Sequence, residues 1–143
     1  MKPVNKFSMM FMSRSSNEAF SRSVVSAFAA QLDPTIEGLS DIKTAVSEAV
    51  TNCIVHAYAD TVGSVYITCE QFDDGVLRIK IRDKGCGISD LKKAMEPLYS
   101  SQQGERAGLG FTVMENFMDS LRVSSKVGKG TTVTMRKKLS VKR

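Results

Sequence analysis

The chain has no tryptophan, a single histidine and only three cysteines among its 143 residues. The cysteines, Cys53, Cys69 and Cys86, are an odd number and form no CxxC or CxxH pair. This spacing argues against a disulfide framework and against a structural zinc site. Such cysteine usage is typical of a reducing compartment, so we expect a cytoplasmic protein without a structural transition-metal centre.

Long apolar runs are also missing. No stretch is long enough to span a membrane, and the N-terminus lacks the uninterrupted apolar core of a signal peptide. The sequence contains no aromatic RNP pattern, zinc finger or basic helix, so we expect no direct contact with nucleic acid and none with membrane. A content of 42% apolar and 24% charged residues predicts one globular domain over residues 1–143.

Acidic residues are absent from the last 24 positions, which carry eight basic groups. Residues 1–119 carry 12 basic and 15 acidic groups, a net charge of −3. The basic end could attract an acidic partner, whether protein, nucleotide or nucleic acid. For residues 136–143 we favour a solvated edge strand and tail, in which lysines discourage pairing with other chains.

Hydrophobic periodicity predicts a β-α-α-β-β-α-β-β order with a short extra helix before the last long one. Strands are expected at 7–13, 64–72, 76–83, 121–127 and 131–139. Helices are expected at about 15–31, from 36 or 40 to 58, at 90–95 and at 111–119. A capping box at 15–18 is expected to open the first helix, and a mobile loop is expected at 100–108. Because the strands cluster in hairpins, we predict an α+β fold: a two-layer α/β sandwich with a mixed, mostly antiparallel sheet and helices on one face.

One polar stripe interrupts an otherwise apolar helix. Glu48, Asn52 and His56 are spaced i, i+4 and i+8, which stacks them on one helical face. A carboxylate can act as a general base, and an amide oxygen one turn away suits Mg²⁺. The alternative is a solvent-facing stripe, and a lone histidine is more often a hydrogen-bonded structural residue than a ligand.

A second motif, Asp83-Lys84-Gly85-Cys86-Gly87, follows the strand predicted at 76–83. The Asp83 carboxylate could accept a hydrogen bond from an exocyclic amine such as adenine N6. Glycines at 85 and 87 would let the backbone approach a flat ligand and turn sharply. Taken alone, the motif also fits a plain turn at the end of a strand.

A third motif, at residues 104–110, reads GERAGLG and leads into the helix predicted at 111–119. Free amides at a helix N-terminus bind phosphate, and Arg106 adds a charge that could pair with a terminal phosphate. The segment is neither a P-loop nor a Rossmann fingerprint, since GxxxxGK[ST] is absent and no strand leads directly into it. An ordinary flexible, glycine-rich loop is the alternative.

The order of the motifs is more specific than any one of them. In this order the sequence resembles the GHKL, or Bergerat-fold, ATPases. The stripe helix is similar to their N box, residues 83–87 to their G1 box, residues 108–110 to their G2 box, and residues 130–132 to the Gly-Thr pattern of their last strand. VSEAVTNCIVHAY, IRDKGCGI, GLGFTVMENFMD and KGTTV look like the serine-kinase anti-sigma branch, and SRSSNEAFSR at 13–22 points to its sporulation members.

The resemblance implies a role for each motif residue. It implies Glu48 as catalytic base, Asn52 as magnesium ligand, and Asp83 as the adenine anchor. It further implies nucleotide contacts from His56, Gly85, Gly87, Arg106, Gly108, Leu109, Gly110 and Thr131 or Thr132. In that family pattern Arg22, on the first predicted helix, matches an arginine that contacts protein partners.

The implied function is a homodimeric anti-sigma factor that binds ATP and Mg²⁺. It would sequester a sporulation sigma factor and phosphorylate a serine of an anti-anti-sigma factor. A related general-stress kinase with other partners stays open, as does a nucleotide-gated binding module with negligible catalysis. Retention of Glu48 argues against the latter, because a carboxylate repels phosphates. The catalytic half of a histidine kinase fits less well, since no long dimerisation helix pair with a phospho-acceptor histidine is present.

Overall fold

The computed structural model describes residues 1–95 and 102–139, of which residues 102–108 are described by their backbone alone. Its elements, in chain order, are β1 (Asn5–Met12), α1 (Ser16–Ala30), α2 (Ile36–Asn52), η1 (Cys53–Ala57), β2 (Ser64–Gln71), β3 (Val76–Asp83), α3 (Leu91–Ala94), α4 (Gln102–Phe117), β4 (Ser120–Lys126) and β5 (Gly130–Lys138). The predicted order of strands and helices is confirmed, with most boundaries shifted by one or two residues.

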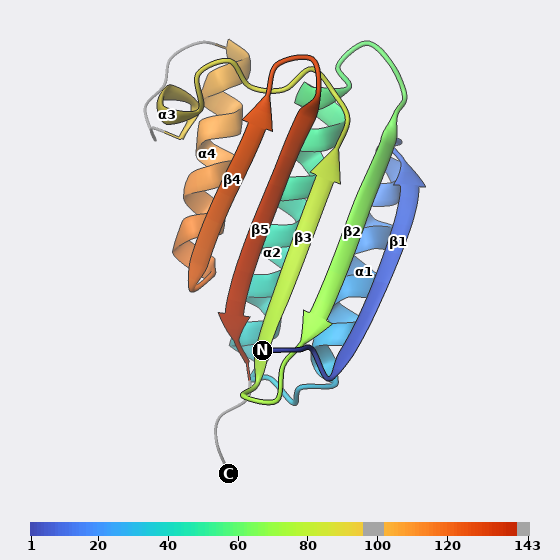
Figure 1. Ribbon diagram of the computed structural model, residues 1–143, viewed down its shortest axis with the longest axis vertical. Helices are drawn as coiled ribbons and strands as arrows, with labels where there is room; N and C mark the ends of the chain where they lie inside the picture. The colour runs from blue at the N-terminus through green and yellow to red at the C-terminus, as the bar shows by residue number, and fades with distance from the viewer. Residues whose placement is uncertain (96–101, 140–143) are drawn as a thin grey trace.

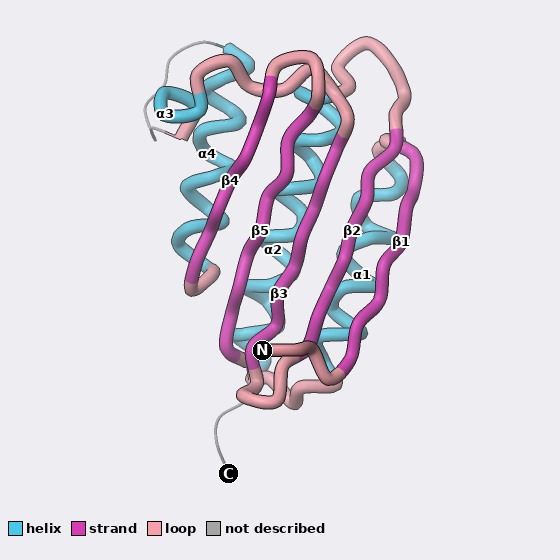
Figure 2. The backbone as a smooth tube through the Cα atoms, in the orientation of Figure 1, coloured by secondary structure: helices cyan, strands magenta, loops and turns pink. Residues whose placement is uncertain are grey.

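The five strands form one sheet in the order β1-β2-β3-β5-β4. All four pairings in it are antiparallel, so the expectation of a mixed sheet is replaced by a wholly antiparallel one. Helices α1, α2 and α4 cover one face of the sheet, and the opposite face carries no helix among the described residues (Figures 1 and 2). The predicted two-layer α+β architecture is therefore confirmed.

The core lies between the sheet and the helices. Strands β2 and β3 alternate strictly between buried and more exposed residues, so that Val65, Ile67, Ile79 and Ile81 all point toward the helices. Helix α2 packs against these side chains through a buried stripe that includes Val46 and Val50. Burying each such aliphatic side chain contributes about 1.5–3 kcal/mol, which fixes the register of α2 over the sheet.

The basic end of the chain does not form an edge strand as predicted. Strand β5 lies between β3 and β4, and it pairs with both along its length. Arg136, for example, is opposite Arg78 on one side and Ser120 on the other. The hairpin at 121–139 was correctly predicted. Which of its two strands pairs with β3, however, depends on packing between segments distant in sequence. Residues 140–143 lie outside the described part.

The predicted capping box at 15–18 does not form. Ser15 has helical backbone angles (φ −57°, ψ −32°), whereas a capping side chain needs an extended backbone to reach back to the helix amides. Its side chain makes no capping bond, and Glu18 instead accepts hydrogen bonds from Arg22 and Ser47. Thr35, which has an extended backbone, does cap α2 by accepting from the Gly38 amide at 2.9 Å.

The helix predicted to run from 36 to 58 changes character after Asn52. Residues 53–57 form the π-helical turn η1, in which the Tyr58 amide donates to the Cys53 carbonyl, five residues earlier, at 3.1 Å. A wider turn delays the rotation of the chain, so His56 is displaced from the straight line expected through Glu48 and Asn52.

The mobile loop predicted at 100–108 is wrong for residues 102–108, because α4 begins at Gln102, nine residues before the predicted helix. Residues 100 and 101, and the expected break at Pro97, lie outside the described part. Glycines at 104, 108 and 110 suggested a loop, but Phe111 and Met114 are fully buried and α4 packs along α2. This tertiary packing overrides the low helix propensity of glycine.

Candidate active site

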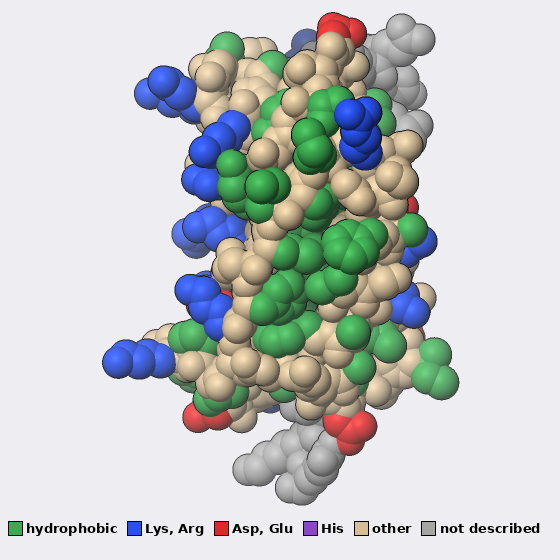
Figure 3. Space-filling view, turned by 90° about the vertical axis from the view of Figure 1, so that its right-hand side faces the viewer, with side chains coloured by type: hydrophobic (Ala, Val, Ile, Leu, Met, Phe, Trp, Pro, Cys, Tyr) green, Lys and Arg blue, Asp and Glu red, His purple; other side chains and the backbone are tan. Residues whose placement is uncertain are grey.

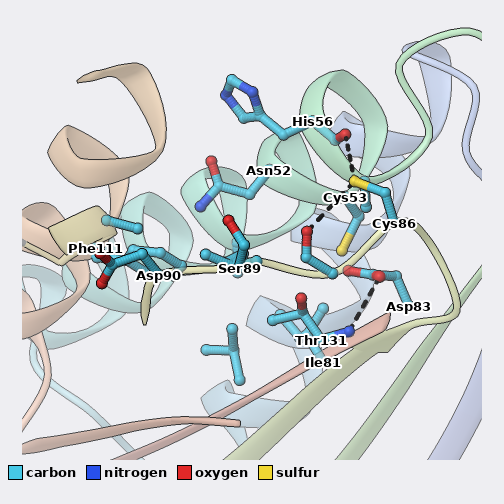
Figure 4. Close-up of a pocket in the computed structure, with 16 residues that line it drawn as sticks. Asn52, Cys53, His56, Ile81, Asp83, Cys86, Ser89, Asp90, Phe111 and Thr131 are labelled. Carbon is cyan, nitrogen blue, oxygen red and sulfur yellow. Dashed lines mark hydrogen bonds between the residues drawn. The ribbon is translucent and has the colours of Figure 1, made fainter. Parts of the chain in front are cut away.

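A cavity of about 230 Å³ opens between α2, η1, the segment after β3, and the start of β5 (Figure 4). The sheet side is formed by Ile81, Asp83, Thr131 and Val133, and the helix side includes Ala49, Asn52 and Phe111; the remaining wall is supplied by Cys53, His56, Ala57, Cys86, Gly87, Ile88, Ser89, Asp90 and Ala94. Most of this lining is apolar, with a few convergent polar groups, which is the usual composition of a small-molecule site.

Asp83 ends β3 at the inner end of the cavity, where only 5% of its surface is exposed. Its Oδ1 accepts from the Gly85 amide at 2.9 Å and from the Thr131 amide at 3.2 Å. The second carboxylate oxygen lies on the side of the Cys53 thiol (Figure 4). One oxygen therefore holds the surrounding backbone in place, while the other is directed toward the cavity.

Burial raises the pKa of the Asp83 carboxyl above its usual range, and hydrogen bonds from Gly85, Cys53 and Thr131 oppose the rise. Burial, together with the nearby Asp83 charge, raises the pKa of the Cys53 thiol well above its usual value. The thiol is therefore protonated and acts as a donor toward Asp83. The cavity thus holds a desolvated acceptor, which favours a ligand that brings its own N–H donor.

The backbone after Asp83 passes between two close neighbours, which is why it needs glycine. A Cβ at Gly85 would overlap the Ala57 carbonyl of η1, and the Cys86 amide donates to that same carbonyl at 3.2 Å. Gly87 has φ +76°, and a Cβ there would overlap the Lys126 carbonyl. The DxGxG motif is therefore more than a plain turn: it forms a tight wall of the cavity.

Tyr58 connects the segment after Asp83 to the start of β2. Its hydroxyl donates to the Ser64 carbonyl at 2.7 Å and accepts from the Lys84 amide at 2.6 Å. Ser125 has a similar role on the other side, where its hydroxyl accepts from the Ile88 amide at 2.8 Å and shares a hydrogen bond with Thr131 at 2.7 Å. Sequence reasoning assigned no role to either residue: Tyr58 ends the VSEAVTNCIVHAY segment and Ser125 lies in a predicted strand, and both act mainly through backbone partners.

Glu48 and Asn52 converge on one small volume beside Gly110 of α4. A Cβ built on Gly110 would lie 3.2 Å from Asn52 Nδ2, 3.3 Å from Asn52 Oδ1 and 3.3 Å from Glu48 Oε2. The absence of a side chain at Gly110 thus brings the backbone of α4 against a carboxylate and an amide. Two of the sequence-predicted motifs, the N box and the G2 box, are adjacent here.

Asn52 is half-buried, and its Nδ2 has no hydrogen-bond partner among the described residues. A buried amide without a partner is costly, which marks this position as one that a polar ligand completes. Within residues 1–95 and 102–139, no group of three or more His, Cys, Asp and Glu side chains is arranged to bind a metal. An amide beside a carboxylate fits an ion such as Mg²⁺, which keeps most of its ligands as water and phosphate oxygen.

His56 lines the cavity from η1, but its imidazole points away from Asp83 and Thr131 (Figure 4). Its carbonyl accepts from the Cys86 thiol at 3.6 Å. Of the two threonines considered, Thr131 lines the cavity, whereas Thr132 is the next residue along β5 and is not among the lining residues.

The predicted helix N-terminus at Gly108–Gly110 is not found, because all three residues lie inside α4. Leu109 is 52% exposed, and Gly110 is buried. Arg106 also lies within α4, and its side chain is outside the described part. Gly110 is a point of close contact with α2, and none of these residues supplies the first amides of a helix.

Arg22 lies on α1, outside the cavity. Its NH1 group donates to Ser47 Oγ at 3.2 Å and to Glu18 Oε1 at 3.4 Å, and Ser47 donates to Glu18 Oε2 at 3.4 Å. Since Ser47 directly precedes Glu48, this network connects the arginine to the helix that carries the polar stripe. The Arg22 side chain is still 39% exposed, which leaves it accessible to another molecule.

The sheet order, the helix layer and this cavity define a nucleotide-binding domain of the histidine kinase-like ATPase type. The family model described as "Histidine kinase-like ATPase domain" matches residues 13–137. A solved structure of the RsbU and RsbW domains of Rv1364c from Mycobacterium tuberculosis has a TM-score of 0.72, at 20% identity over 98% of this chain and 34% of that one. The histidine kinase domain of Erythrobacter litoralis EL346 has a TM-score of 0.57, at 21% identity over 85% and 61%. At such identities the two structures support the fold alone.

Sequence relatives define the group more closely. The anti-sigma F factor of Thermoanaerobacter pseudethanolicus is 55% identical over 139 residues, 96% of each chain. That of Clostridium acetobutylicum is 49% identical over 138 residues, again 96% of each chain. The chain belongs to the histidine kinase-like ATPase family and, within it, to the anti-sigma F factors.

Proposed function

We propose that the protein is an ATP-dependent anti-sigma factor that sequesters a sporulation sigma factor and phosphorylates a serine of its anti-anti-sigma antagonist. The observation that carries this proposal is that Asn52, which lines the same cavity as Asp83, lies together with Glu48 against Gly110. This arrangement supports Glu48 as the base, Asn52 as a ligand of an ion and Asp83 as the acceptor for a nucleobase. Identity of 49–55% with anti-sigma F factors supports the sporulation partners over those of a general-stress kinase.

The nucleobase is proposed to bind between the sheet and α2. Ile81, Val133 and Ala49 offer apolar surface to a flat ring, and the desolvated Asp83 carboxylate accepts from its exocyclic amine. Adenine has such an amine, and hypoxanthine, with a carbonyl at that position, does not. The acceptor at Asp83 therefore favours ATP over nucleotides that present an oxygen there.

The phosphates are proposed to extend from this cavity toward Glu48 and Asn52. Asn52 would help to hold Mg²⁺, and the ion, when bound, neutralises charge on the phosphate oxygens. Gly110 leaves room for the phosphates beside α2. From the family resemblance we retain Arg106 as a partner of the terminal phosphate, and Gly108, Leu109 and His56 as further contacts.

Phosphoryl transfer needs positioning more than covalent chemistry from the protein. In the proposed step the serine oxygen forms a bond to the γ-phosphorus, and the bond from that phosphorus to the bridging oxygen of ADP breaks. Glu48 accepts the serine proton, and ADP leaves with the electron pair of the broken bond. No phosphorylated side chain of this protein is required.

Partner binding is assigned to α1, where Arg22 is exposed on the helix layer and linked through Ser47 to α2. We propose that the sigma factor and the anti-anti-sigma factor both contact this arginine, that the protein acts as a homodimer, and that it works in the cytoplasm beside the transcription machinery. No helix within residues 1–95 and 102–139 combines the length and the apolar character that crossing a membrane requires.

The test uses three purified proteins: this chain, the sporulation sigma factor and the anti-anti-sigma factor. Radiolabelled ATP with Mg²⁺ should give phosphoserine on the anti-anti-sigma factor, and ATP should raise the affinity for the sigma factor. A matched reaction with the antagonist's acceptor serine changed to alanine controls for transfer elsewhere. If ATP binds tightly but no phosphoserine forms, the protein is a nucleotide-gated binding module and not a kinase.

A further inference from the structure

The face of the sheet opposite the helices is strongly basic. Strand alternation directs six exposed side chains outward from β3, β4 and β5, and together we call them the basic face: Lys80, Arg82, Arg122, Lys126, Arg136 and Lys138. In a view of the β1 edge, Lys and Arg side chains form a row along the side of the molecule on which the uncovered sheet lies (Figure 3). Helices α1, α2 and α4 are all on the other side.

Little negative charge balances this surface. The only acidic residues in the described strands are Glu70 and Asp83; Asp83 faces the cavity, and Glu70 accepts from Arg78 Nε at 2.7 Å. None of the six side chains of the basic face has an ion-pair partner among the described residues. Arg78 and Arg136 are directly opposite each other across β3 and β5, an arrangement that costs stability. The ion pair between Arg78 and Glu70 offsets part of this repulsion, whereas Arg136 has no ion-pair partner among the described residues.

The basic face is bordered by an apolar corner at β1. Met10 and Met12 point outward and are 58% and 53% exposed. Met10 is opposite Tyr66 of β2, and the Arg82 guanidinium stacks over the Tyr66 ring at 4.7 Å. A phosphate backbone has no apolar surface for the methionine side chains to pack against, whereas flexible thioethers pack well against apolar side chains of a protein partner. The combination therefore favours a protein over a nucleic acid.

We propose that this outer face is a docking surface for an acidic, amphipathic segment of a protein partner. Acidic side chains of the segment would lie over the basic face, and its apolar side chains would contact Met10, Met12 and Tyr66. The surface is on the opposite side of the sheet from α1 and Arg22, and it does not include the cavity lining. It therefore provides a second contact region, usable while nucleotide and an α1-bound partner are both present.

Three fluorescent probes test the proposal on the full chain: an acidic peptide with interspersed leucines, a glutamate peptide of equal length and charge, and a DNA duplex of similar charge. The face variant carries Lys80→Glu, Arg122→Glu and Arg136→Glu. The control variant carries Arg14→Glu, Lys43→Glu and Lys92→Glu, which are exposed positions after β1, on α2 and on α3, away from this face. Both triple changes move the net charge from +5 to −1, so only the location differs.

The leucine-containing peptide should bind wild type most tightly, and its affinity should fall about 30-fold or more in the face variant against less than about 3-fold in the control. Met10→Ser with Met12→Ser should remove its advantage over the glutamate peptide. ATP affinity should be unchanged in all variants, which shows that they fold and separates this result from a failure of the proposed kinase site.

Three results would overturn the proposal. Equal losses in the face and control variants would reduce the effect to net charge. Tighter binding of the duplex than of either peptide, lost in the face variant, would make this a nucleic-acid surface. A fall in oligomeric state of the face variant, measured by sedimentation velocity, would mean that a second copy of the chain covers it.

Discussion

Replacing Asp83 by asparagine separates the ligand-binding role of this residue from its role in stability. Asn keeps the size of Asp, and its carbonyl oxygen can still accept from the Gly85 and Thr131 amides. The second position then becomes an NH₂ group directed to the side of the Cys53 thiol and the cavity. An adenine amine would meet a donor where the wild type offers a carboxylate oxygen.

The loss of ATP affinity follows from two terms. A hydrogen bond to a charged acceptor contributes about 1.5–3 kcal/mol, and opposing two buried donors costs about 1–3 kcal/mol more. Their sum of about 2.5–6 kcal/mol corresponds to a rise in Kd of about 10²–10⁴-fold. Inosine triphosphate, which presents a carbonyl oxygen in place of the amine, should lose much less affinity or gain some.

The unliganded protein should respond in the opposite direction. Because burial raises the pKa of Asp83 in the folded state, folding at neutral pH retains a desolvated charge that the unfolded chain would solvate. The Asn variant has no such charge, so its free energy of unfolding should equal or exceed that of wild type at pH 7 by up to about 1 kcal/mol. As pH falls through the folded-state pKa, wild-type Asp83 becomes protonated and this difference should shrink.

Isothermal titration with both nucleotides, and urea unfolding from pH 4 to 7, measure the two effects. Asp74→Asn, at an exposed turn, is the matched control and should change neither nucleotide affinity appreciably. Equal weakening of ATP and inosine triphosphate in the Asp83 variant would refute direct recognition of the amine. A variant destabilised by several kcal/mol would refute the interpretation of Asp83 as a costly buried charge.

Three further variants test the other assigned roles. Glu48→Gln should reduce single-turnover transfer to the anti-anti-sigma serine by about 10²–10⁴-fold while ATP binding survives, since Gln cannot accept the proton; wild-type rates would exclude Glu48 as the base. Asn52→Ala should abolish the Mg²⁺ dependence of ATP binding, which titration with and without Mg²⁺ would reveal, and an unchanged dependence would remove Asn52 from this role. Arg22→Ala should weaken sigma-factor binding and leave ATP affinity intact, with Arg14→Ala as control; loss of nucleotide binding alone would contradict the assignment.

Hydrophobic periodicity was sufficient to predict the strands and the two-layer architecture, because β2 and β3 alternate and α1 and α2 are amphipathic. It could not place β5 between β3 and β4, since both strands of that hairpin look alike from their own sequences. It also misplaced the start of α4. Local propensity assigned glycines to a loop, and the buried Phe111 and Met114 that hold α4 on α2 act through contacts distant in sequence.

Five of the residues predicted from motifs line the cavity, namely Asn52, His56, Asp83, Gly87 and Thr131, but the contacts that organise them were not predicted. The close approach of Gly110 to Glu48 and Asn52 depends on two helices crossing, which no spacing rule specifies. The Tyr58 hydroxyl donates to the Ser64 carbonyl and accepts from the Lys84 amide. Because both partners are backbone groups, which every residue type carries, the sequence does not indicate these contacts.

The π-helical turn explains why His56 does not continue the polar stripe formed by Glu48 and Asn52. A regular α-helix through residues 53–57 would continue the line from Glu48 through Asn52 to His56. Instead, the wider turn brings the Ala57 carbonyl against Gly85, where it accepts from the Cys86 amide, and it aligns Tyr58 to hold Lys84. As a result, His56 is not in line with Glu48 and Asn52, but the turn makes a fixed contact with the segment that follows Asp83. The two halves of the cavity, one on α2 and one at the end of β3, are thereby joined by the Ala57 carbonyl and the Tyr58 hydroxyl of one irregular turn.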